Sequence, residues 1–64
     1  MIVLTRLNDT SFVLNCELIE TVEETPDTVI STTNGKKYVI RENIEEIIDK
    51  VVAYKQKIQL INRV

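Results

Sequence analysis

The sequence contains no histidine and no tryptophan, and it has one cysteine, one glycine and one proline among 64 residues. A single cysteine cannot form an internal disulfide, so we expect Cys16 to be a small buried hydrophobic residue. Without histidine, a structural zinc site is disfavoured, and no side chain has an ordinary pKa suited to acid–base catalysis near neutral pH. One glycine cannot form a glycine-rich phosphate loop. The sequence therefore predicts no enzymatic activity, no cofactor and no metal site.

The small size of the chain makes independent folding difficult, because short domains bury a small fraction of their surface. Disulfides, metals and oligomerisation are the usual aids at this size, and only the last remains here. Apolar residues nevertheless make up 44% of the chain, mostly isoleucine and valine, and β-branched residues favour strands. No apolar run reaches the eighteen or so residues of a membrane span, and the start does not resemble a signal peptide. We expect a single cytoplasmic domain, residues 1–64, that forms a homo-oligomer.

Turn signals divide the first forty residues into short apolar runs. Asn8-Asp9 and Pro26-Asp27 are typical of turns, and Asn34-Gly35 predicts a type I′ hairpin turn. Asn15 ends one further run, so the runs are 2–7, 12–14, 18–25, 28–32 and 36–40. Residues 1–40 therefore predict an antiparallel meander of about five strands. Because several runs are apolar on both faces, we expect the sheet to curl or to close into a small barrel.

Residues 43–61 predict one long C-terminal α-helix, which makes the fold class α+β. Asn43 suits the N-cap position, and Glu46 follows three residues later, as in a capping box. Apolar residues recur every three or four positions, which is typical of a helix that covers a sheet. Ile48 and Val52 widen this apolar stripe. The positions of the stripe are Ile44, Ile47, Val51, Tyr54, Ile58 and Ile61.

The predicted helix is longer than the strands that it covers. From Ile44 to Ile61 it would measure about 27 Å, whereas strands of five or six residues reach about 17–20 Å. Its last two turns should therefore extend beyond the sheet, where apolar side chains usually mark a contact. We hypothesise that this end binds a second copy or a partner through Ile58, Leu60, Ile61 and Val64.

Charges are sorted along the chain, although the net charge is only −2. Six acids and no base lie between Leu7 and Gly35, whereas four bases and no acid lie from Lys50 onward. This acidic balance is not typical of nucleic-acid-binding proteins. The Lys36-Lys37 pair at a predicted hairpin tip leaves a small nucleic-acid-binding regulator as the alternative function. The basic end also leaves a peripheral association with anionic lipid as an alternative.

Four segments carry a resemblance to a known family when they are taken in order and at their spacing. They are residues 4–8, 15–20, 25–30 and 33–38, and the likeness continues through Glu42 and residues 45–48 into the helix. The chain resembles the FlbD family of small bacterial flagellar proteins, to which the swarming motility protein SwrD belongs. The family usually has Asn-Gly at the first turn, where this chain has Asn8-Asp9, so the type of that turn is in question.

The resemblance implies a flagellar accessory or adaptor protein without catalytic residues or cofactors. It implies support of motility through contacts that assist the motor stator, with a motor or basal-body protein as partner. It also implies a location in the cytoplasm, at the inner face of the membrane near the motor. The matching motif Thr25-Pro26-Asp27-Thr28 has no known role, and a turn that sets strand pairing is one interpretation of it.

Overall fold

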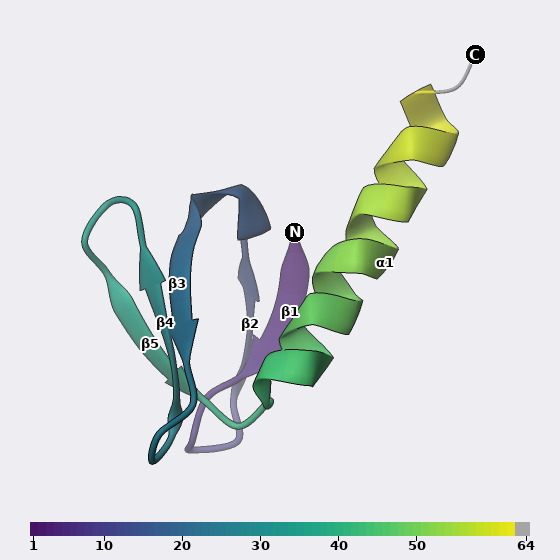
Figure 1. Ribbon diagram of the computed structural model, residues 1–64. Helices are drawn as coiled ribbons and strands as arrows, with labels where there is room; N and C mark the ends of the chain where they lie inside the picture. Colours follow the sequence, from purple (N-terminus) through teal and green to yellow (C-terminus); the bar gives the residue numbers. More distant parts are fainter. Residues whose placement is uncertain (63–64) are drawn as a thin grey trace.

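Five short strands and one long helix make up the computed structural model, which describes the backbone of residues 1–62 and the side chains of residues 1–58 (Figure 1). This arrangement confirms the α+β class, and the helix begins and ends within one residue of its predicted bounds. The elements are β1 (Ile2–Thr5), β2 (Ser11–Leu14), the short 3₁₀ helix η1 (Cys16–Leu18), β3 (Ile19–Glu23), β4 (Thr28–Thr32), β5 (Lys37–Ile40) and α1 (Ile44–Asn62).

The strands form two antiparallel sheets, one of β1 and β2 and one of β3, β4 and β5 in that order. The predicted single meander or barrel is therefore wrong. Strands β2 and β3 do not pair because η1 interrupts the chain between them, held by Asn15, whose side chain accepts a hydrogen bond from the Glu17 N–H. The two sheets meet where Arg6 bridges Ile40 and where the Arg41 N–H donates to the Thr5 carbonyl at 2.9 Å.

Two hairpins, β1–β2 and β4–β5, turn with the same backbone geometry. In the first, the Asp9 N–H donates to the Arg6 carbonyl at 2.9 Å, and Asp9 has a φ of 67°. In the second, the Gly35 N–H donates to the Thr32 carbonyl at 3.0 Å, and Gly35 has a φ of 82°. The turns are Arg6–Asp9 and Thr32–Gly35, and each places its fourth residue in the left-handed region, which glycine, asparagine and aspartate tolerate best.

The turn at Asn34-Gly35 is not the predicted type I′ turn. Type I′ needs a positive φ at both central residues, but Asn34 has none and only Gly35 does. The turn instead centres on Thr33 and Asn34, and Gly35 follows them. A hydrogen bond from the Thr32 hydroxyl to the Asn34 side chain holds Asn34 in this arrangement. The hairpin itself is confirmed.

Replacing Gly35 by alanine should lower the free energy of unfolding by about 1–2 kcal/mol, the cost of a left-handed conformation for a residue with a Cβ atom. A Cβ atom at this position would have no atom within 4 Å, so the loss comes from the backbone alone. Asp9→Gly is the matched control, since it relieves the same conformation at the other hairpin. Urea unfolding followed by circular dichroism measures both. Equal stability of Gly35→Ala and the wild type would contradict this account.

The hydrophobic core lies between the two sheets and the helix. It draws one or two residues from nearly every element: Ile2, Leu4, Leu14, Cys16, Ile30, Ile40 and Ile47. Cys16 is buried, as expected from the sequence. The helix closes this core with Ile47, while Val51 and Tyr54 pack at its margin.

The start of helix α1 is held from two directions. The capping box is confirmed, because the Glu46 N–H donates to the Asn43 side chain at 2.8 Å and the Asn43 N–H donates to the Glu46 carboxylate at 3.1 Å. The Glu24 carboxylate, just after β3, accepts a hydrogen bond from the Ile44 N–H at 2.7 Å. The first turn of the helix is therefore fixed to the three-stranded sheet as well as to its own cap.

The molecule is elongated because the helix continues past the strands (Figure 1). Its extents are 43 × 23 × 19 Å and its radius of gyration is 12.4 Å, against about 10.7 Å expected for a compact chain of this length. The helix has 19 residues, or about 28 Å, whereas the strands have four or five. The last turns of the helix, beyond Tyr54 at the margin of the core, therefore project from the body.

Candidate functional site

Of the residues predicted for self-association, Ile58, Leu60 and Ile61 belong to the end of helix α1. Ile58 is half-buried. The side chains of Leu60 and Ile61, and all of Val64, lie outside the described residues.

The motif Thr25-Pro26-Asp27-Thr28 forms the turn between β3 and the start of β4. Thr28 is buried and lies opposite Ile40 in the β4–β5 pair, whereas the other three residues are exposed. Part of the motif borders a shallow cavity of about 230 Å³, which is lined by Leu7, Pro26, Asp27, Thr28, Ile40 and Arg41. Arg41 is already engaged there, with an ion pair to Asp9 at 2.6 Å. The motif thus joins two paired strands, and its role stays a prediction.

An apolar groove of about 300 Å³ lies between strand β3 and helix α1. We call it the acidic groove, for the carboxylates around it. Its floor and walls are formed by Cys16, Ile19, Val22, Ile47, Ile48, Val51 and Val52. Ile48 is 54% exposed and Val52 is 49% exposed. The sequence placed both in the apolar stripe that covers the sheet, but neither side chain faces the sheet. They form the outer wall of the groove.

A β-bulge explains why the strand contributes two apolar residues to the groove. Residues three apart on a regular strand point to opposite faces. The β3–β4 register shifts between Ile19, which lies opposite Thr32, and Thr21, which lies opposite Ser31. The extra residue brings Ile19 and Val22 to the same side, where both pack against the core.

Two exposed carboxylates, Glu45 and Asp49 of the helix, flank the outer wall of the acidic groove. On the helix each acid precedes a wall residue, Ile48 or Val52, by three positions, and such residues are neighbours on a helix surface. The groove therefore joins an apolar floor to a negative rim.

An ion pair between Glu17 of η1 and Lys55 of α1 lies at one end of this surface. Both side chains are about half exposed. The hydrogen bond and the opposite charge of Lys55 lower the pKa of Glu17, and the same bond raises the pKa of Lys55. The pair therefore stays ionised near neutral pH and contributes no net charge to the rim.

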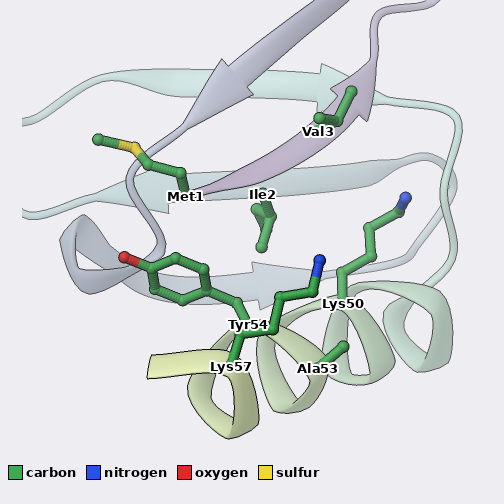
Figure 2. Close-up of a pocket in the computed structure, with 7 residues that line it drawn as sticks. All are labelled: Met1, Ile2, Val3, Lys50, Ala53, Tyr54 and Lys57. Atoms are coloured by element: carbon green, nitrogen blue, oxygen red, sulfur yellow. The ribbon is translucent and has the colours of Figure 1, made fainter. Parts of the chain in front are cut away.

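A second pocket, of about 230 Å³, lies between β1 and the helix and has basic residues at its border (Figure 2). We call it the basic pocket. Figure 2 shows Lys50 and Lys57 extending from the helix toward β1. The basic pocket is lined by Met1, Ile2, Val3, Lys50, Ala53, Tyr54 and Lys57. The charge sorting seen in the sequence thus becomes two differently charged surfaces on one helix.

Within the described part of the chain, no three residues among histidine, cysteine, aspartate and glutamate are grouped so as to hold a metal ion. None of the described helices has the length and apolar character needed to cross a membrane.

Comparison with protein families gives one match over nearly the whole chain. The model of the FlbD family, described as flagellar and swarming motility proteins, matches residues 1–59. Searches of curated proteins and of solved structures gave no match.

Proposed function

The chain belongs to the FlbD family of flagellar and swarming motility proteins, and from this premise we propose that it is a non-enzymatic accessory of the flagellum. It supports motility by binding another protein of the motor or basal body. We further propose that this binding assists the stator units, and that it takes place in the cytoplasm at the inner face of the membrane.

The observation that carries the proposal is the open apolar groove between β3 and α1, with its half-exposed wall residues Ile48 and Val52. Apolar side chains that remain half in water on a small domain usually mark a contact with another chain. A shallow apolar surface with charged residues at its border resembles the core and rim of a protein–protein interface. The basic pocket offers a second such surface.

Deletion of the gene in its own bacterium tests this proposal. We expect cells that still build flagella but swarm poorly, with reduced torque on tethered cells and recovery when the gene is restored. Extra copies of the stator genes should restore part of the torque. Unchanged swarming and torque would refute the proposal, and altered flagellar transcription with direct DNA binding would favour a nucleic-acid-binding regulator instead.

A further inference from the structure

We propose that the acidic groove binds the basic C-terminal end of helix α1 from a second copy of this chain. The inference goes beyond the flagellar role, because it concerns how the protein assembles with itself, and it can be tested without any motor protein. Three observations carry it: the shape of the groove, the charge of its rim, and the sequence and placement of the helix end.

The groove needs apolar side chains to cover it. Its lining is almost entirely aliphatic, and its volume of about 300 Å³ suits a few apolar side chains rather than a whole domain. Ile48 and Val52 keep about half of their surface in water in the isolated chain. Covering them would remove this surface from water, which favours association.

The rim of the groove selects a positively charged occupant. Within residues 1–58 the ion pairs are Arg41 with Asp9 and Lys55 with Glu17. Neither of the two rim carboxylates, Glu45 and Asp49, therefore has a cation partner in that range. Complementary charge across an interface selects the partner and its orientation. The fitting occupant is apolar and basic.

The chain itself contains a segment that is both apolar and basic. Residues 57–63 contain Lys57 and Arg63 together with Ile58, Leu60 and Ile61, and no acid follows Asp49 in the sequence. The described end of the helix, up to Asn62, extends beyond the strands (Figure 1). The segment cannot enter its own groove, since Val52 and residue 60 lie on one continuous helix, about 12 Å apart along its axis. The occupant must therefore come from another copy.

A reciprocal charge reversal in the full chain tests the proposal, with the mass measured by sedimentation equilibrium over a range of protein concentrations. The wild type should exceed its monomer mass of 7.4 kDa as concentration rises, and salt should weaken the association. Glu45→Lys with Asp49→Lys, and separately Lys57→Glu with Arg63→Glu, should each weaken it on the order of tenfold or more. A mixture of the two double variants should associate again, because their charges are complementary.

The control is Lys36→Glu with Lys37→Glu, which makes the same charge change as the helix-end variant but at the β4–β5 hairpin. It should associate like the wild type, and circular dichroism should show that all three variants are folded. A wild type that stays monomeric at every concentration overturns the proposal. So does an effect of only one of the two reversals, or a mixture that fails to associate.

Discussion

Replacement of Ile30 by alanine should leave little of the folded state at room temperature. Ile30 is completely buried in β4, the middle strand of its sheet, with Val22 on one side and Tyr38 on the other. Truncating a buried isoleucine to alanine removes about 2–5 kcal/mol from the free energy of unfolding. A core in a domain of this size rarely supplies more than about 3–5 kcal/mol in total. One substitution therefore removes most of the free energy of unfolding.

Urea unfolding at a single fixed protein concentration measures this effect, because any self-association would make stability depend on concentration. Val13→Ala is the matched control, since Val13 also lies on a strand but is 62% exposed. Ile30→Val should lose only about 0.5–1.5 kcal/mol. If Ile30→Ala is no less stable than Val13→Ala, the core is not where the structure places it.

Replacement of Glu42 by alanine should also lower the free energy of unfolding. Glu42 lies just before the helix, and its carboxylate accepts hydrogen bonds from both the backbone N–H and the hydroxyl of Thr5, each at 2.9 Å. These bonds fix the helix entry to the end of β1. Hydrogen bonds to a charged group contribute about 1.5–3 kcal/mol, and the partial exposure of Glu42 reduces this to about 1–2 kcal/mol.

The contribution of Glu42 should also depend on pH. Burial raises the pKa of Glu42, but the two hydrogen bonds from Thr5, a hydrogen bond from the Glu42 backbone and the charge of Lys50 together outweigh it and hold the pKa below the ordinary value of 4.5. Because the folded pKa is lower than the unfolded one, the stabilisation is fully present above pH 4.5. It is lost as the pH falls through the folded pKa.

The free energies of unfolding of the wild type and Glu42→Gln should therefore converge as the pH is lowered from neutral through this range. Glu17→Gln serves as a comparison, because the pKa of Glu17 is also lowered but its side chain binds Lys55 instead of the backbone. A difference between wild type and Glu42→Gln that stays constant with pH would show that the ionised carboxylate does not carry the effect.

The local elements of the fold could be predicted because their signals lie within a few residues. Asn34-Gly35 located a hairpin, and Asn43 with Glu46 located the start of the helix. The division into two sheets could not be predicted, because Asn15 reads as the end of a strand and its side-chain bond to the Glu17 N–H creates η1 instead. The turn type was also missed, because an Asn-Gly pair suits more than one hairpin turn.

The candidate site was predictable only in its charges. The acidic first half and the basic end stand out in the sequence, but nothing there indicates that Val22 of β3 and Ile48 of the helix line one groove. The bulge near Ile19 has no glycine to signal it. Ile48 and Val52 matched the apolar stripe, yet the helix contacts its small, divided sheet only along a narrow face, so both stay at its margin.

The hydrogen bonds at the start of helix α1 fix the position of its first turn, so the far end can move when the helix tilts about that turn. Glu24 and the capping box hold its first turn from the three-stranded sheet and from the chain before it, while its far end stands clear of the body. Over a length of about 28 Å, a tilt of about 5° at the first turn would move the far end by about 2.5 Å. A force on that end would therefore first load the contacts nearest to it, the Lys55–Glu17 ion pair and the packing of Tyr54, before it reaches the Ile44 N–H bound by Glu24.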